Sequence, residues 1–297
     1  MPVSEDDAED PRRGERIAKW LARAGVASRR DAEKMIAEGR VTLGGKVVES
    51  PATFITPGDH VAVDGKPVAA AERTRLFRYH KPDGLVTTHR DPQGRPTVFE
   101  KLPPGLPRLV SVGRLDLTSE GLLLLTNDGA LARKLELPSN AWLRRYRVRV
   151  HGRVDERALA NLERGVTIEG VQYGPIEAGL DARQGTNSWL TVSIKEGKNR
   201  EIRRVMAHLG LEVTRLIRTA YGPFQLGILP RGAVEEVNAK VLRDQLGLDA
   251  PKRLRETALA PLPEAPPEGP RRTPRARNAI MGTRRPVRGR DGPRGRE

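Results

Sequence analysis

Four consecutive leucines, Leu122–Leu125, limit the folding of this chain more than any other feature of its sequence. An uninterrupted apolar run of this kind, closed by the turn sequence Asn127-Asp128-Gly129, predicts a strand that is buried. A polar turn precedes the run, and Asp116 lies just before that turn, two residues after Arg114. An acid on a short loop packed against a buried strand is a candidate nucleophile or acid–base group. The alternative is that Arg114 and Asp116 form an ordinary surface ion pair.

Residues 113–129, GRLDLTSEGLLLLTNDG, closely resemble the catalytic signature of the RsuA/RluB-type pseudouridine synthases. In that family the acid of the GRLD sequence is the nucleophile, so the resemblance implies this role for Asp116. Isomerising uridine to pseudouridine requires breaking the bond between ribose and base nitrogen and re-bonding the base through ring carbon 5. This chemistry needs an ionised carboxylate, and a cation that keeps it ionised, because burial alone would raise its pKa. It also needs an aromatic surface for the loose base and a way to unstack the nucleotide, but no cofactor or metal.

Two further segments supply the remaining groups by resemblance. Tyr146, in RRYRVRV, matches the family's tyrosine at the start of a sheet strand, where it would face the base. The segment GKNREIRRVMAHLG resembles the family's K-N-R-Q-[IV]-R-R-M stretch, with Glu201 in place of the usual Gln and Val205 in place of the usual Met. Arg203 there aligns with the cation that pairs with the catalytic acid, and its neighbour Arg204 is the alternative.

The resemblance also implies substrate contacts. The segment HKPDGLVTT resembles the family's entry strand, in which Lys81 is the residue expected to face RNA. The segment VTRLIRTAYGPFQLGILPRG resembles the closing strand and loop, in which Leu216 would pack against the base and Arg218 would support the acid or the RNA. In related enzymes the position of Arg114 enters the gap left by the flipped base. Core packing is the alternative for Leu216, and a surface ion pair is the alternative for Arg114.

Residues 15–70 are predicted to form a compact basic module. RIAKWLARAG has apolar residues at helical spacing, and Ser28 is expected to cap a second helix, with short strands following. The pattern resembles the small RNA-binding module named for the fourth protein of the small ribosomal subunit. The resemblance implies RNA contacts from four basic residues: Arg29, Arg30, Arg40 and Lys46. A solvated basic face is the alternative, since phosphate contacts add affinity but do not choose a sequence.

Residues 74–248 are predicted to form an α+β domain. Strand-like segments outnumber helical ones there, and the connections are mostly too short for helical crossovers. A mainly antiparallel sheet with helices packed on it is therefore expected.

Composition indicates the class of partner. The chain has 53 Lys and Arg against 38 Asp and Glu, a net charge of +15, which is typical of proteins that bind an anionic polymer or a membrane surface. No apolar run is long enough to span a bilayer, and the acidic residues 1–14 are unlike a signal peptide and are expected to be disordered. The absence of cysteine fits the cytoplasm, and five scattered histidines predict no metal site.

Residues 249–297 are predicted to be a disordered basic tail. Of residues 251–297, 13 are basic, 5 are acidic and 9 are proline, too little apolar material for a core. Long basic C-terminal extensions occur in the RluB-type members of the family, which modify the large ribosomal subunit, and this implies a target in 23S rRNA near the peptidyl-transferase region. A solubility tail without a partner is the alternative.

These observations together predict a cytoplasmic, monomeric rRNA pseudouridine synthase that acts without a cofactor on 23S rRNA, free or in a pre-ribosomal particle. The same chemistry on 16S rRNA and a non-catalytic rRNA-binding or ribosome-assembly protein are the alternatives. A glycoside hydrolase would need a second carboxylate facing Asp116, for which Glu120 is the nearest in sequence, and the basic composition argues against a neutral sugar.

Overall fold

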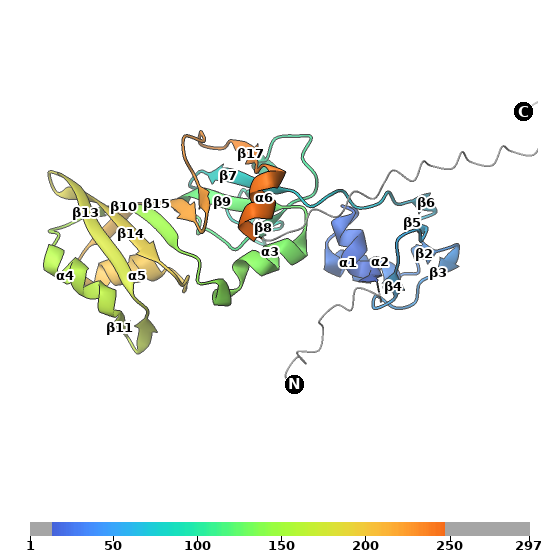
Figure 1. The fold of residues 1–297 in the computed structure, drawn as a ribbon, viewed down its shortest axis with the longest axis horizontal. Coiled ribbons are helices and arrows are strands. Elements are labelled where there is room, and N and C mark those ends of the chain that lie inside the picture. Colours follow the sequence, from blue (N-terminus) through green and yellow to red (C-terminus); the bar gives the residue numbers. More distant parts are fainter. Residues whose placement is uncertain (1–13, 247–297) are drawn as a thin grey trace, which may run out of the picture. The chain divides into compact units, whose positions relative to one another are not determined.

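The computed structural model describes residues 14–246 of the 297-residue chain. The predictions for the acidic N-terminus and for the basic tail at 249–297 concern residues that lie outside this range, apart from Gly14. The expected α+β fold class is confirmed: two sheet-containing bodies with helices are present in the described range (Figure 1). No helix within residues 14–246 combines the length and the apolar character needed to cross a bilayer.

The N-terminal body has its own small core. Its elements are β1 (Glu15–Arg16), α1 (Ile17–Arg23), α2 (Arg29–Ala37), β2 (Val41–Leu43), β3 (Lys46–Val47), β4 (Phe54–Ile55), β5 (Val61–Val63) and β6 (Lys66–Pro67). Strands pair in the order β3-β2-β5-β6, and β1 pairs with β4. The Ser28 hydroxyl accepts the backbone N–H of Asp31 at 3.1 Å, so the predicted cap of the second helix is present. Ile17, Leu21 and Ile36 bring both helices onto the strands.

The larger body is built on one long sheet. Its strands, in spatial order, are β13 (Ile176–Gln184), β14 (Asn187–Ile194), β10 (Arg144–His151), β15 (Glu212–Tyr221), β9 (Ser119–Thr126), β7 (Leu76–Lys81) and β17 (Val234–Glu236). In addition β8 (Val110–Val112) pairs with β9, and β16 (Phe224–Gln225) pairs with β15. All neighbours are antiparallel except β9 and β15, which are parallel and share three residue pairs. The sheet is therefore mainly antiparallel, as predicted, with one parallel junction near its middle.

The leucine run forms the interior of β9, and every residue of this strand is buried. Leu123 and Leu125 belong to one hydrophobic core, which also holds Tyr79 and Tyr146. Leu122 and Leu124 belong to a second core on the other face of the strand, together with residues of α3 (Gly129–Glu136). A strand covered on both faces needs consecutive apolar residues rather than alternation, which explains the run.

The remaining helices cover the sheet or follow it. They are α4 (Glu156–Asn161), α5 (Glu201–His208) and α6 (Ala239–Leu246), with 3-10 turns η1 (Phe99–Lys101), η2 (Pro138–Asn140) and η3 (Leu162–Arg164) and a hairpin of β11 (Val166–Ile168) and β12 (Val171–Tyr173). Ile202, Val205 and Met206 of α5 are buried in the core, as their spacing predicts.

The segment HKPDGLVTT, which resembles the family's entry strand, is a strand only as far as Lys81, and residues 85–88 do not form one. Val86 makes only an isolated bridge to Thr97, because the turn at Pro82–Gly84, with φ of +79° at Gly84, ends β7 at Lys81. The segment instead runs as an irregular loop, in which the Thr87 hydroxyl donates to the carbonyl oxygen of Leu115 at 2.9 Å.

Candidate active site

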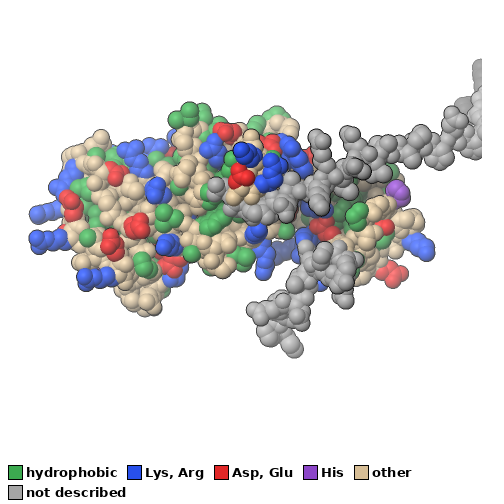
Figure 2. All heavy atoms as spheres, viewed as in Figure 1, with side chains coloured by type: hydrophobic (Ala, Val, Ile, Leu, Met, Phe, Trp, Pro, Cys, Tyr) green, Lys and Arg blue, Asp and Glu red, His purple; other side chains and the backbone are tan. Residues whose placement is uncertain are grey.

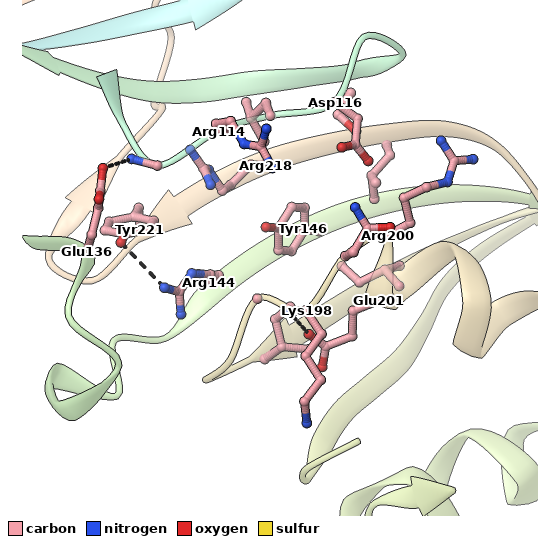
Figure 3. Close-up of a pocket in the computed structure, with 18 residues that line it drawn as sticks. Arg114, Asp116, Glu136, Arg144, Tyr146, Lys198, Arg200, Glu201, Arg218 and Tyr221 are labelled. Carbon is pink, nitrogen blue, oxygen red and sulfur yellow. Dashed lines mark hydrogen bonds between the residues drawn. The ribbon is translucent and has the colours of Figure 1, made fainter. Parts of the chain in front are cut away.

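A cavity of about 300 Å³ lies over β10 and β15, between the loop that follows β8 and the loop that precedes α5. Five residues predicted from the sequence line it together: Arg114, Asp116, Tyr146, Leu216 and Arg218. Figure 3 shows Asp116 and Arg114 on one side of the cavity, Tyr146 on β10 at its centre, and Arg200 and Glu201 on the opposite side. Segments about 100 positions apart in sequence therefore meet at one site.

The loop that carries Asp116 is fixed by hydrogen bonds from several elements. The N–H of Gly113 donates to Glu136 Oε1 of α3 at 2.5 Å, and the N–H of Gly84 donates to the Leu117 carbonyl at 2.8 Å. The N–H of Ser119 donates to the Asp116 carbonyl at 3.0 Å and closes the turn into β9. The half-buried Asp116 side chain thus stands on a backbone held at both ends, as a group that must keep its geometry during a reaction requires.

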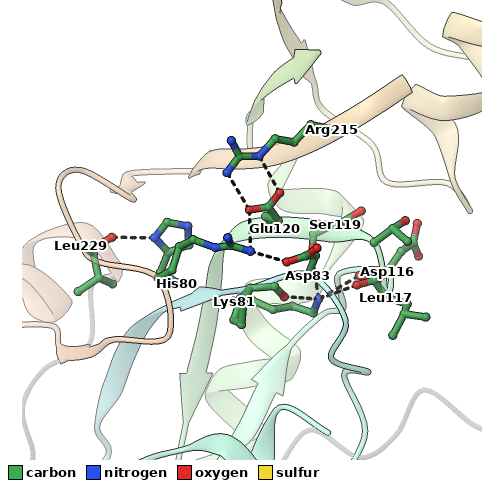
Figure 4. Close-up of polar contacts among 12 residues, drawn as sticks. His80, Lys81, Asp83, Asp116, Leu117, Ser119, Glu120, Arg215 and Leu229 are labelled. Carbon is green, nitrogen blue, oxygen red and sulfur yellow. Dashed lines mark hydrogen bonds and ion pairs between the residues drawn. The ribbon is translucent and has the colours of Figure 1, made fainter. Parts of the chain in front are cut away.

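Lys81 is not available to RNA, and the prediction that it contacts RNA is wrong. Its side chain is fully buried, and Nζ lies within hydrogen-bond distance of four carbonyl oxygens: those of Pro82 at 3.0 Å, Asp116 at 3.1 Å, Leu117 at 3.3 Å and Ser119 at 2.8 Å (Figure 4). Burial lowers the pKa of this amine to about 8, although nearby acids act in the opposite direction. Lys81 therefore anchors the Asp116 loop from the protein side.

Arg203 lies on the Asp116 side of α5, but no ion pair within 4.0 Å joins the two among the described residues. Its guanidinium donates to the carbonyl and hydroxyl oxygens of Thr118 at 3.1 and 3.0 Å and to the Val213 carbonyl at 3.1 Å. Burial lowers the pKa of Arg203, as does the charge of Arg200, while the charge of Asp116 raises it. Instead of the expected direct contact with Asp116, Arg203 contacts Thr118, two residues further along the same loop.

Arg204 faces elsewhere. It is exposed and lines a separate cavity with Thr167 and His208. Of the two neighbouring arginines, Arg203 is the one that interacts with the Asp116 loop.

On β15, Leu216 is buried in the core, as its alternative interpretation predicts, and it also lines the cavity. Arg218 is buried and donates from Nε to the Leu122 carbonyl at 2.8 Å, while its Nη2 has no hydrogen-bond partner in the described part of the chain. Arg114 is exposed at the cavity and forms no ion pair with any described residue. The surface ion pair of Arg114 with Asp116 is therefore absent from residues 14–246.

Glu120 does not provide a second free carboxylate. It is buried, and its oxygens bind Arg215 Nε at 2.8 Å, Arg215 Nη2 at 3.0 Å and Arg231 Nη2 at 3.3 Å (Figure 4). Its carboxylate does not line the cavity, so Glu120 is not the second acid that the glycosidase alternative would need beside Asp116.

Several cavity residues were not predicted from the sequence. Arg144 and Tyr221 line it from β10 and β15, and Glu136 lines it from α3. Lys198, Asn199 and the left-handed Arg200 line it from the loop before α5, beside the buried Glu201. The sequence Lys198-Asn199-Arg200 before the helix was the one available signal for this loop, because its residues are all polar and show no apolar periodicity.

In the N-terminal body, Arg29 and Arg30 are exposed on α2, and Lys46 is exposed on β3. Arg40 is also exposed, but its guanidinium binds Asp64 at 2.9 and 2.7 Å and Glu38 at 3.2 Å. Figure 2 shows basic and acidic side chains interspersed over the face of the described residues that is seen in this view.

Comparison with known proteins places both bodies in described families. Residues 75–208 match the family described as RNA pseudouridylate synthase, and residues 15–61 match the S4 domain. A Rickettsia felis protein named uncharacterized RNA pseudouridine synthase is 48% identical over 228 residues, which cover 77% of this chain and 99% of that protein. A crystal structure of a pseudouridylate synthase, 27% identical, superposes with a TM-score of 0.53 and covers 77% of this chain and 98% of that one.

Other relatives carry a more specific name. A Pasteurella multocida protein named ribosomal large subunit pseudouridine synthase B is 43% identical over 247 residues, which cover 80% of this chain and 72% of that protein. An Escherichia coli protein of the same name is 42% identical over 233 residues, which cover 75% of this chain and 79% of that protein.

Proposed function

Because this chain belongs to the RNA pseudouridine synthase family, we propose that it isomerises a specific uridine of 23S rRNA, with Asp116 as the nucleophile. The observation that carries this proposal is the meeting of Asp116 and Tyr146 in one cavity, on a loop and a strand from different parts of the chain. A carboxylate and a base-sized aromatic surface side by side are what the isomerisation needs.

The reaction breaks two bonds of the substrate, from the anomeric carbon to N1 and from C5 to hydrogen, and forms two, from the anomeric carbon to C5 and from N1 to hydrogen. As the nucleophile, the Asp116 carboxylate bonds to the anomeric carbon while the bond from this carbon to N1 breaks, with its electron pair leaving on the uracil. The ring then turns on the Tyr146 surface, C5 bonds to the anomeric carbon and displaces the carboxylate, the C5 proton is lost and N1 gains a proton. Arg203 holds the Thr118 turn from α5, and so positions the loop that carries Asp116.

The target nucleotide must leave its stack to reach this cavity. Arg114 is exposed beside Asp116 and without an ion pair among the described residues, so it is free to occupy the space that the flipped base leaves. Leu216 packs against the base, and Arg218, a buried cation that lines the cavity on the same strand, supports the acid or the RNA.

The choice of 23S rRNA rests on the relatives named ribosomal large subunit pseudouridine synthase B and on the basic composition of residues 249–297. We assign RNA docking to residues 15–70, through Arg29, Arg30 and Lys46, and catalysis to residues 74–248. The 13 basic residues of 251–297 add salt-dependent affinity for crowded rRNA.

Asp116→Asn tests the nucleophile. This variant should bind an rRNA fragment within a few-fold of wild type, because the phosphate contacts are retained, and should form no detectable pseudouridine. Binding is measured by filter retention, and the product by carbodiimide mapping of the same RNA. Glu163→Gln, at an exposed position of η3, is the matched control and should behave as wild type. Substantial turnover by Asp116→Asn would remove the assignment.

Pseudouridine mapping of total rRNA from cells that lack this protein tests the substrate. We expect the loss of one large-subunit site with all other sites intact. Loss of a small-subunit site instead would transfer the same chemistry to 16S rRNA. Intact maps of both rRNAs would favour a binding or assembly role.

A further inference from the structure

The larger sheet has one face that its second core covers only in part. Over β7, β9 and the end of β15, apolar residues of α3 and α6 pack on this face and form the second core. No residue of β10, β13 or β14 belongs to that core. The helices α4 and α5 pack with the first core, on the side of the sheet that holds Tyr146. On the side away from Tyr146, the strands β10, β13 and β14 therefore present a face without an apolar core.

Three arginines alternate along β10 on this side of the sheet. Every second residue from Tyr146 to Val150 is buried in the first core, so the residues between them point to the other face. These residues are Arg145, Arg147 and Arg149, which we call the arginine face. Arg145 and Arg147 are exposed, and Arg149 is half-buried. A rise of about 3.4 Å per residue spaces their Cα atoms about 6.8 Å apart along the strand.

The charges of the arginine face are not neutralised by the protein. None of the three guanidinium groups forms an ion pair or a hydrogen bond within residues 14–246, and the Nε of Arg149 is buried without a partner. Arg149 also lies opposite a fourth arginine, Arg215 of β15, whose own charge is bound by Glu120. Like charges at neighbouring positions of a sheet are destabilising. The row of arginines is therefore costly in the isolated protein, and an anionic partner would relieve that cost.

The acids on the same side of the sheet lie at its margins. Glu177 and Asp181 belong to the edge strand β13, two strands away from β10, and Asp181 accepts the hydroxyl of Thr191 at 3.0 Å. Glu212 lies opposite His151, beyond the last of the three arginines. The positive charge thus forms an uninterrupted row along β10.

An aromatic ring supports the middle of this row. Trp189 of β14 lies opposite Arg149, is half-buried and belongs to neither core of the larger body. The Arg147 guanidinium lies over this ring, 4.6 Å from its centroid. Stacking on the ring limits the freedom of the guanidinium and leaves its N–H donors available. A preorganised guanidinium is suited to bidentate recognition of phosphate.

We propose that the arginine face binds the phosphate backbone of an RNA segment other than the one that enters the cavity. The spacing of the three arginines is comparable with that of successive phosphates along one RNA strand. Tyr146 and the arginines project from opposite faces of β10, so the nucleotide at Tyr146 and the phosphates at the arginine face belong to separate segments of a long RNA. Phosphate contacts of this kind add affinity and orient the protein without choosing a sequence. The inference rests on the proposed function only in taking rRNA as the anion.

The experiment measures the Kd of the full-length protein for a full-length 23S rRNA transcript over a range of KCl concentrations. Arg145→Gln combined with Arg147→Gln should weaken binding and reduce the slope of log K against log salt by about 1.4–1.8, because about 0.7–0.9 is lost for each phosphate that is no longer neutralised. Arg145→Lys combined with Arg147→Lys keeps both charges and should restore most of the slope. The charge-matched control replaces two exposed arginines of α4 and η3 by glutamine, Arg157 and Arg164, and should change the slope less.

Equal slopes for the glutamine variant of the arginine face and for the control would overturn the proposal. Pseudouridine formation is measured on the same preparation of wild type. A difference in slope together with an absence of pseudouridine would refute the proposed function and support this inference, so the two failures are distinguishable.

Chemical modification tests the arginine face in the unaltered protein, in case the variants fail to fold. Wild type is treated with phenylglyoxal in the presence and absence of the 23S rRNA transcript, and the modified arginines are identified by mass spectrometry. RNA should protect Arg145 and Arg147, whereas Arg157 and Arg164 should stay reactive. Equal modification of Arg145 and Arg147 with and without RNA would overturn the proposal.

Discussion

At the scale of single residues, the side chains behind the cavity matter as much as those that line it. Lys81 contributes no surface, yet its amine is surrounded by the carbonyls of Pro82, Asp116, Leu117 and Ser119. Three of these oxygens belong to the turn that carries Asp116, so a single ammonium group stabilises the backbone of the whole turn.

Lys81→Met should lower the free energy of unfolding by about 2–4 kcal/mol, because buried carbonyls would lose their donor. In the folded fraction of the variant, kcat should fall by a factor whose equivalent in activation free energy is at least as large as the loss of folding free energy. The RNA Kd should stay within a few-fold of wild type. Denaturant titration and single-turnover kinetics measure the two effects. Lys101→Met, at an exposed position, should change stability by less than about 0.5 kcal/mol. A variant that only weakens RNA binding would restore Lys81 as an RNA contact.

The different success of prediction for Asp116 and Lys81 has a physical reason. Four residues that line one cavity could be selected from the sequence, because their local sequences resemble a known pattern: Asp116, Tyr146, Leu216 and Arg218. The role of Lys81 depends on carbonyls 35 to 38 positions away, and a backbone oxygen leaves no signature in sequence.

At the scale of elements, strong periodicity was predictive and weak periodicity was not. The buried β9 and the apolar face of α5 follow from a leucine run and from helical spacing. The edge strand β13 was missed, because its sequence IEAGLDARQ is mostly exposed and its pairing shifts register between Leu180 and Ala182. Edge strands need little apolar material, so their pattern is faint.

The parallel junction of β9 and β15 depends on one glycine. Gly121 has φ of +100°, and a Cβ there would lie 2.3 Å from the carbonyl oxygen and 2.7 Å from the nitrogen of Arg218. Gly121→Ala should therefore lower the free energy of unfolding by about 2–4 kcal/mol, by strain and by separating the strands. The control is Gly129→Ala, at the first residue of α3, where no atom lies within 4 Å of the added Cβ. Its free energy of unfolding should lie within about 0.5 kcal/mol of wild type. Equal free energies of unfolding for the two variants would contradict this prediction and would show that β9 and β15 can move apart to admit the Cβ without loss of stability.

At the scale of the whole molecule, RNA affinity should be divided between the N-terminal body and the rest of the chain. Replacing Arg29, Arg30 and Lys46 together by Ala should weaken binding of long rRNA and reduce the slope of log K against log salt by about 0.7–0.9 for each phosphate that is no longer neutralised. Replacing three exposed arginines of the larger body, Arg157, Arg164 and Arg243, is the charge-matched control and should alter the slope less. Equal slopes for both triple variants would mean that the face of α2 is only solvated.

The order of strands in the larger sheet has a consequence for synthesis. Every strand pair of the N-terminal body lies within residues 15–67. In the larger sheet, by contrast, Phe77–Tyr79 of β7 pair with Val234–Glu236 of β17, which are synthesised much later. At 5–20 residues per second the ribosome needs roughly 10–30 s to make the intervening chain. During that interval the nascent protein already displays Arg29 and Arg30 but lacks the Arg203 and Leu216 side of its cavity. A growing chain of this protein would therefore hold RNA before it can modify any.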